Sequence, residues 1–205
     1  SPRPPRTRSS ARRSTGTTVG ASDRFGSAAT VLVIMGGLPG VGKTTVARAV
    51  ARRLAAAHLR IDSIETAIAR SEDFGSPVIV AGYEVGYAVA ADQLALGLSV
   101  VADSVNPVAI TREAWLRVAR AAGVPAVQVE VVCSDLAQHR ERVEPRVSDL
   151  PGLTLPTWAA VQARDYEPWG PDVRVDTAYL SVETATERIV TAVGERLAVA
   201  PCHHD

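Results

Sequence analysis

The sequence predicts a three-layer α/β fold, in which a mostly parallel sheet of about five strands has helices on both faces. Short apolar runs alternate with segments whose apolar residues recur at helical spacing, and this alternation is typical of parallel sheets covered on both sides. A glycine-rich turn separates the first apolar run from the first helical pattern. With 205 residues and 46% hydrophobic content, the chain is long enough for one domain with an ordinary core.

Six apolar runs are candidate strands, and helical patterns fill most of the gaps between them. The candidate strands are residues 31–35, 58–61, 78–81, 99–103, 127–132 and 173–176. The expected helices are residues 46–57, 63–70, 83–98, 111–122, 134–144, 157–165 and 181–198. Because parallel sheets bind ligands at the carboxyl ends of their strands, functional residues are expected directly after these runs.

Composition divides the chain into three parts. Residues 1–28 are rich in Pro, Arg, Ser, Thr and Gly, which predicts a disordered extension or, less simply, an interaction arm. Residues 29–200 are the expected folded domain, with a lid or flap at about 136–172, and residues 201–205 form a C-terminal tail. Six of the 22 basic residues but only one of the 22 acidic residues precede residue 29. The folded part is therefore mildly acidic, which makes nucleic acid an unexpected partner.

The sequence also bears on location. No apolar stretch approaches the length that a membrane-spanning helix needs. The two cysteines, Cys133 and Cys202, lie far apart in different contexts and suggest neither a disulfide framework nor a zinc site. We therefore expect a cytoplasmic protein that does not interact with membranes.

The strongest motif is a phosphate-binding loop, or Walker A sequence. It fits the pattern G-x-x-x-x-G-K-[ST] and consists of Gly37, Leu38, Pro39, Gly40, Val41, Gly42, Lys43 and Thr44, with Thr45 behind it. Glycines let successive backbone N–H groups turn toward a polyphosphate, and the following helix adds positive potential. Lys43 is expected to bridge the terminal phosphates and Thr44 to bind Mg²⁺. Lys43 is the only lysine of the chain, which fits a site that needs a compact cation.

Asp62 follows the second candidate strand, at the same expected edge as the loop. A carboxylate there is suited to accept the proton of an attacking hydroxyl group. The alternative is that Asp62 only caps the helix that follows.

A second carboxylate, Asp103, ends the apolar run at 99–103. This is the Walker B pattern, in which the carboxylate holds Mg²⁺, although buried strands also end in Asp for reasons of turn geometry. Asn106 lies in the turn after it, and Arg112 begins the next helix near the same edge. We expect Asp103, Asn106 and Arg112 to contact the substrate together with Asp62.

Arginines are concentrated after the fifth candidate strand. Arg140, Arg142 and Arg146 are expected in a lid, where they would neutralise charge on a transferred phosphoryl group. The alternative is a solvated helix whose arginines pair with neighbouring glutamates. Residues 147–172 contain several Pro and Gly residues around a short helix and suggest a flap that places Arg164.

Taken together, these segments resemble the small P-loop kinases, a group that includes polynucleotide kinases, chloramphenicol phosphotransferases, zeta toxins and gluconate kinases. The resemblance covers about residues 30–197 and rests on the loop from Gly37 to Thr45, the context of Asp62, the segment from Asp103 to Asn106, Arg112 and the arginine-rich lid. It implies a P-loop NTPase fold, ATP and Mg²⁺ as cofactors, and Asp62 as the base toward the acceptor hydroxyl.

The resemblance also bears on the acceptor. Polynucleotide kinases carry an arginine three residues after the base aspartate, whereas this chain has Glu65 at that position. An acidic side chain would repel a nucleic-acid phosphate, so a small neutral acceptor, as in the chloramphenicol phosphotransferases, is expected. The overall prediction is an ATP-dependent kinase with an alcohol group as acceptor. The alternatives are a polynucleotide or nucleotide 5′-hydroxyl kinase and a P-loop ATPase that phosphorylates no acceptor.

Overall fold

The structure of the protein is a computed structural model that describes residues 29–71, 78–145 and 147–199. The predicted extension at 1–28, the lid residue Arg146 and the tail at 201–205 lie outside the described residues. The strands are β1 (Leu32–Gly36), β2 (Ala57–Arg60), β3 (Val100–Asp103), β4 (Ala126–Val132) and β5 (Val173–Asp176). The helices are α1 (Lys43–Leu54), α2 (Ile61–Ala69), α3 (Val78–Ala95), α4 (Ala109–Ala121), α5 (Leu136–Val143), α6 (Trp158–Gln162) and α7 (Val182–Val199).

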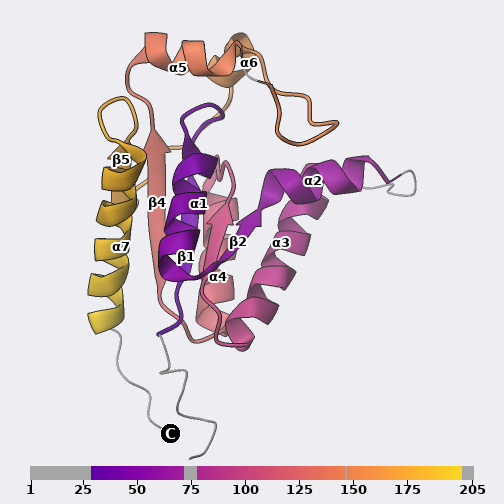
Figure 1. The fold of residues 1–205 in the computed structure, drawn as a ribbon. Coiled ribbons are helices and arrows are strands. Elements are labelled where there is room, and N and C mark those ends of the chain that lie inside the picture. Colours follow the sequence, from indigo (N-terminus) through magenta and orange to yellow (C-terminus); the bar gives the residue numbers. More distant parts are fainter. Residues whose placement is uncertain (1–28, 72–77, 146, 200–205) are drawn as a thin grey trace, which may run out of the picture.

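The five strands form one parallel sheet in the order β2-β3-β1-β4-β5, which confirms the predicted fold class (Figure 1). Strand β1 is central, and Met35 near its end lies opposite Asp103 of β3 and Val129 of β4. The chain runs from β1 to strands on one side and later to strands on the other. The loop after β1 therefore opens into the crevice where such folds bind ligands.

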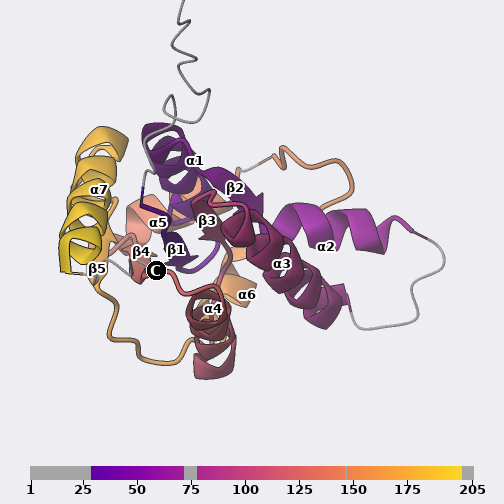
Figure 2. The ribbon, with the colours of Figure 1, turned by 90° about the horizontal axis from the view of Figure 1, so that it is seen from below.

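Strand β1 is buried on both faces, and its side chains alternate between two cores. Val33 and Met35 belong to the core that α1 and α7 cover, whereas Leu32 and Ile34 belong to the core with α3 and α4. The second core contains the fully buried Trp115. Figure 2 shows the molecule from below, with α1 and α7 on one side of the sheet and α3 and α4 on the other. A continuous apolar strand with helices on both faces is the expected layout of a parallel sheet.

One predicted strand is wrong. Residues 78–81 lie in the first turn of α3, which extends over Val78–Ala95 rather than the expected 83–98. A short apolar run does not distinguish a strand from a buried helix. Here the run is not even fully buried, because Val80 is 61% exposed. The remaining predicted strands agree with the structure to within one residue at each end.

The lid consists of α5, α6 and the loops around them. Both helices lie across the carboxyl end of the sheet, above the loop that follows β1 (Figure 1). Asp135 caps α5 by accepting hydrogen bonds from the N–H groups of Ala137 and Gln138, and Thr157 caps α6 through Ala160. These caps define where each short helix begins. Over the described part of the chain, no helix combines the length and apolar character that a bilayer crossing requires.

Candidate functional site

The phosphate-binding loop has the backbone conformation that its glycines predict. Gly40 and Gly42 have φ angles of 86° and 88°, a left-handed region that glycine adopts without a steric penalty. Gly42 is the N-cap of α1, so the helix begins at Lys43, one turn earlier than expected. The first N–H groups of α1 are thus directed toward the cavity end of the helix, where they favour an anion.

Gly37 provides a test of the loop geometry. Its φ angle is 142°, and a Cβ atom at this position would lie 2.2 Å from the carbonyl oxygen of Val131. We expect Gly37→Ala to lower the free energy of unfolding by roughly 1–3 kcal/mol, because both strain and a backbone clash oppose the substitution. Gly97→Ala is the matched control, since Gly97 also has a left-handed φ, 77°, but meets no described atom within 4 Å. Chemical denaturation measures the free energy of unfolding of both variants. An equal loss in Gly37→Ala and Gly97→Ala would contradict the clash with Val131.

Lys43 and Asp103 form a buried pair behind the loop. Lys43 is 7% exposed and Asp103 is 2% exposed, and Nζ of Lys43 lies 3.7 Å from Oδ1 of Asp103. Nε2 of His58 lies 3.2 Å from the other carboxylate oxygen. Burial alone would raise the pKa of Asp103, but the ammonium of Lys43 and hydrogen bonds from His58 and Thr44 outweigh it and lower this pKa. Asp103 is therefore held as a carboxylate.

Asp62 lies in the first turn of α2, and its side chain is 35% exposed and lines the cavity. The predicted alternative, a purely capping role, finds no support: α2 starts after Arg60, and in the described structure no side chain caps it. Oδ2 of Asp62 lies 3.6 Å from Nη2 of Arg60. Asp62 is thus available to a ligand in the cavity.

Glu65 lies one turn after Asp62 and packs against Gly82 of α3. Burial, followed by the nearby charge of Asp62, raises the pKa of Glu65 to about 7, although Arg164 opposes the shift. The sequence singled out Glu65 as a departure from polynucleotide kinases. The structure places it inside the cavity beside the predicted base.

The raised pKa of Glu65 predicts a pH-dependent stability. The folded protein holds this proton more tightly than the unfolded chain does. Ionisation of Glu65 therefore lowers the free energy of unfolding as the pH rises from about 4.5 through about 7. We therefore expect Glu65→Gln to raise the melting temperature at pH 8 and to leave it unchanged near pH 4, where the carboxyl group is neutral in both states. Thermal unfolding at both pH values tests this, and a gain that is equal at both would contradict it.

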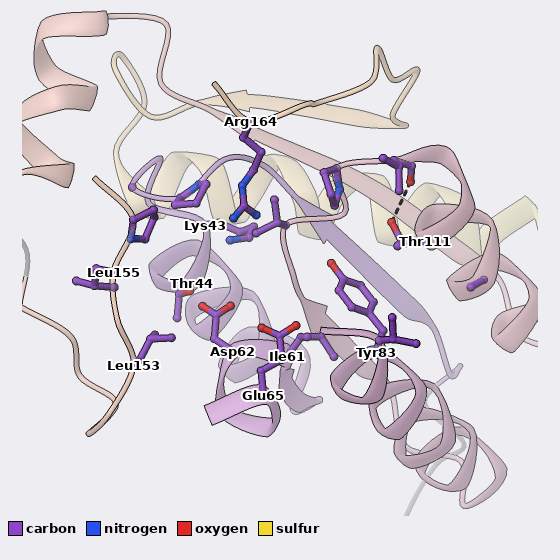
Figure 3. Close-up of a pocket in the computed structure, with 18 of the residues that line it drawn as sticks. Lys43, Thr44, Ile61, Asp62, Glu65, Tyr83, Thr111, Leu153, Leu155 and Arg164 are labelled. Atoms are coloured by element: carbon purple, nitrogen blue, oxygen red, sulfur yellow. Dashed lines mark hydrogen bonds between the residues drawn. The ribbon is translucent and has the colours of Figure 1, made fainter. Parts of the chain in front are cut away.

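One cavity of about 810 Å³ joins the phosphate-binding loop to Asp62 (Figure 3). Pro39, Gly40, Gly42, Lys43, Thr44 and Thr45 line the loop side. Apolar and aromatic residues line the far side, among them Ile61, Tyr83, Tyr87, Val108, Leu153 and Leu155. The arrangement offers a polar end for phosphates and an apolar compartment beside a carboxylate.

The lid arginines differ in position. Arg142 lines the cavity and donates hydrogen bonds to Gln138, to Oγ1 of Thr177 at 2.7 Å and to the Thr177 carbonyl at 3.0 Å. Arg140 pairs with Glu144 at 2.8 Å, as the solvated-helix alternative expects, and lines a separate hollow beside α6. Arg164 extends from the end of the α6 region into the cavity above Lys43 (Figure 3).

Asn106 and Arg112 are buried in the protein rather than placed in the cavity. Nδ2 of Asn106 donates to the Met35 carbonyl at 2.8 Å. Arg112 donates to the carbonyls of Asn106, Pro107, Glu167 and Pro168, and its guanidinium lies over the rings of Tyr166 and Trp169. Neither residue is among the described residues that line the cavity. Asn106 ties the loop after β3 to β1, and Arg112 ties the same loop to residues 167 and 168, so we do not retain them as substrate ligands.

Two supporting residues carry no recognisable signal in the sequence. Thr177, after β5, donates through Oγ1 to the carbonyl of Val41 at 2.8 Å and accepts the bond from Arg142. His139 of α5 lies buried with Nε2 2.8 Å from the carbonyl of Pro39. Both tie the lid to the phosphate-binding loop across more than 90 residues of sequence, a proximity that only the fold creates.

Comparisons with solved structures show the same fold. The Mycobacterium tuberculosis APS kinase CysC in complex with AMPPNP and APS is similar with a TM-score of 0.62 and 19% identity, over 81% of this chain and 98% of that chain. A gluconokinase from Sinorhizobium meliloti 1021 has a TM-score of 0.58 and 19% identity, over 86% and 98%. Chaetomium thermophilum Kti12 in complex with ADP-AlF3 has a TM-score of 0.61 and 19% identity, over 81% and 98%.

The sequence comparisons are of two kinds. Curated protein sequences give no match. The profile of a family described as the AAA domain matches residues 32–165, which include the phosphate-binding loop, Asp62, Asp103 and the lid as far as Arg164. This match spans more than half of the sequence, and the chain therefore belongs to the AAA domain family.

Proposed function

We propose that the protein is an ATP-dependent kinase that transfers the γ-phosphoryl group of Mg-ATP to a hydroxyl group of a small molecule. One observation carries this proposal: a single cavity contains the phosphate-binding loop, the carboxylate of Asp62 and an apolar compartment beside it. A nucleotide bound at the loop would direct its terminal phosphate toward Asp62. An acceptor in the apolar compartment would then lie between the two.

Each residue in this proposal has a distinct role. Asp62 accepts the proton of the acceptor hydroxyl as its oxygen forms the bond to phosphorus. Lys43 contacts the terminal phosphates from the loop side. Arg164 and Arg142 also line the cavity, where positive charge stabilises the transferred group. Arg140 is the weaker candidate for this role because its described partner is Glu144.

The residues present also fit a magnesium ion. Mg²⁺ prefers oxygen ligands, and the hydroxyl group of Thr44 and the ionised carboxylate of Asp103 lie together at the start of α1 and the end of β3. These two residues would hold the ion, which would supply charge neutralisation at the phosphates. The low pKa of Asp103 keeps its carboxylate ready to bind a cation near neutral pH.

The similar structures support a kinase of small molecules. They include an APS kinase with AMPPNP and APS bound, a gluconokinase and a sugar kinase from Janibacter. Kti12, which is equally similar, was solved with ADP-AlF3. Two structures of this fold thus hold nucleotide ligands, and the names of the kinases indicate that their substrates differ.

The acceptor compartment favours a small molecule over a nucleic-acid end. Its wall contains the carboxyl groups of Glu65 and Glu84 beside Tyr83 and Tyr87, whereas Arg117 is the basic residue on the α4 side. Acidic groups at the acceptor site oppose the binding of a polyanionic strand. A neutral molecule with apolar surface and an accessible hydroxyl group fits this wall better.

The proposal is tested by acceptor-dependent formation of ADP. We would incubate the protein with Mg-ATP and a panel of hydroxylated metabolites and antibiotics, with a 5′-hydroxyl oligonucleotide as comparator, and follow ADP by a coupled assay. The proposal expects at least one small molecule to accelerate ADP formation while the oligonucleotide does not. Steady ADP formation that no acceptor changes would favour the ATPase alternative, and stimulation by the oligonucleotide alone would favour the 5′-hydroxyl kinase.

A further inference from the structure

A short segment of the lid is tied to the strand that precedes Asp62. We call residues 147–156 the strap. Oγ of Ser148 donates to the carbonyl of Leu150 at 2.9 Å and accepts from its N–H group at 3.0 Å, which forms a tight turn around Asp149. Beyond this turn, Leu153 and Leu155 line the cavity (Figure 3). The strap therefore covers the proposed acceptor compartment, and Asp149 is its attachment point.

Asp149 is held by two arginines from different elements. Nη2 of Arg48 in α1 donates to Oδ2 of Asp149 at 2.7 Å. Nη1 of Arg60 at the end of β2 donates to both carboxylate oxygens, each at 2.9 Å. Hydrogen bonds from Arg48 and then Arg60 lower the pKa of Asp149 to about 2, so the attachment is an ionic one at physiological pH.

Arg60 also faces Asp62. The guanidinium is buried, with the residue 5% exposed, and its Nη2 lies 3.6 Å from Oδ2 of Asp62, just beyond hydrogen-bond distance. Its Nε and Nη2 atoms are buried and have no acceptor among the described residues. Buried charged donors without partners are unfavourable. A small rotation of Asp62 would satisfy Nη2, whereas Asp149 is the counterion of the same guanidinium group through Nη1.

We propose that Arg60 couples docking of the strap to the orientation of Asp62. While the strap is docked, Asp149 binds Arg60, and the oxygens of Asp62 stay directed into the cavity. When the strap lifts, Arg60 loses its hydrogen-bonded counterion and draws the carboxylate of Asp62 onto itself. The catalytic consequence rests on the proposed function: Asp62 is in place to accept a proton only when Leu153 and Leu155 cover the acceptor, which disfavours transfer to water. Arg60 is then a positioning residue.

The first test is structural and does not depend on activity. We would determine the crystal structure of Asp149→Ala, whose truncated side chain is half-exposed and leaves no internal cavity. The expected result is a hydrogen bond between Asp62 and Nη2 of Arg60. An Asp62 side chain that keeps its 3.6 Å separation would overturn the proposal. If Asp62 turns onto Arg60 but transfer to the acceptor is unaffected, the coupling holds and the role of Asp62 as base fails.

The second test is kinetic and uses a second-site reversal. Asp149→Ala should lower kcat for transfer about tenfold. This is the result expected if the fraction of molecules with Asp62 directed into the cavity falls to about one tenth. Nucleotide affinity should not change. Adding Arg60→Gln to Asp149→Ala should raise kcat again, because the competing cation is gone. A double variant no better than Asp149→Ala would show a purely structural role and contradict the proposal.

Arg48→Ala is the matched control. Arg48 contacts Asp149 as Arg60 does, but it belongs to α1 and its described ionic partner is Asp149 alone. Its loss should leave the Arg60–Asp149 contact in place. We expect kcat to stay within about twofold of that of the original protein, because a surface ion pair contributes little free energy. A tenfold loss in this variant would mean that loosening of the strap alone explains the kinetics, against the proposed coupling.

Discussion

Lys43→Ala is expected to lower phosphoryl transfer by about 100- to 1,000-fold, the scale of losing one charged group that stabilises a transition state. The ammonium of Lys43 sits at the start of α1, on the loop side of the cavity. Turnover with Mg-ATP and an acceptor measures the effect. Unchanged turnover would contradict the assignment of the loop as the phosphate site.

Burial of Lys43 requires a control for stability. Its removal leaves Asp103 with the imidazole of His58 as the remaining basic neighbour within 4 Å in the described structure, so some loss of melting temperature is expected as well. Lys43→Arg keeps the positive charge near Asp103 but replaces the compact ammonium by a planar group. We expect Lys43→Arg to recover much of the stability and little of the activity. Recovery of both would show that any cation suffices at this position.

Asp62→Asn is expected to lower transfer to the acceptor by about 100-fold or more, the usual effect of removing a general base. Nucleotide affinity should barely change, because the nucleotide is held by the loop after β1. Substitution by Asn preserves size, and Asp62 is partly exposed, so the fold should keep its stability. Nucleotide binding, thermal unfolding and transfer would be measured on one preparation.

Glu65→Gln is the matched control for Asp62→Asn. Glu65 lies one turn away in the same cavity, and its pKa of about 7 would also suit a proton acceptor. Our proposal expects a loss below tenfold for Glu65→Gln and a far larger one for Asp62→Asn. The opposite ranking would transfer the role of base to Glu65. A joint fall of binding and transfer in Asp62→Asn would instead assign Asp62 to nucleotide binding.

The sequence predicted the fold and the phosphate-binding loop well because both depend on local patterns. Alternating apolar runs identify strands of a parallel sheet, and the loop motif fixes glycines where left-handed backbone is needed. The strand predicted at 78–81 was wrong because four apolar residues at the start of a helix look like a strand, and the helix continues through Tyr83 and beyond.

The site was less predictable, because long-range contacts decide the roles of individual side chains. Arg112 was expected at the substrate, yet the fold surrounds it with four carbonyl oxygens and two aromatic rings. Arg60 and Asp149 are 89 residues apart and unremarkable in the sequence, yet they meet beside Asp62. No local pattern encodes such pairs, and the packing of the lid against β2 creates them.

Direct detection of a phosphorylated acceptor tests the central claim most closely. Mass spectrometry of a mixture of hydroxylated small molecules, incubated with Mg-ATP and the protein, would reveal any molecule that gains a phosphoryl group. The account predicts such a product with the original protein, a yield lower by about 100-fold with Asp62→Asn, and unchanged nucleotide binding by that variant. Equal yields of the product from both proteins would contradict the claim that Asp62 and the phosphate-binding loop form one kinase site.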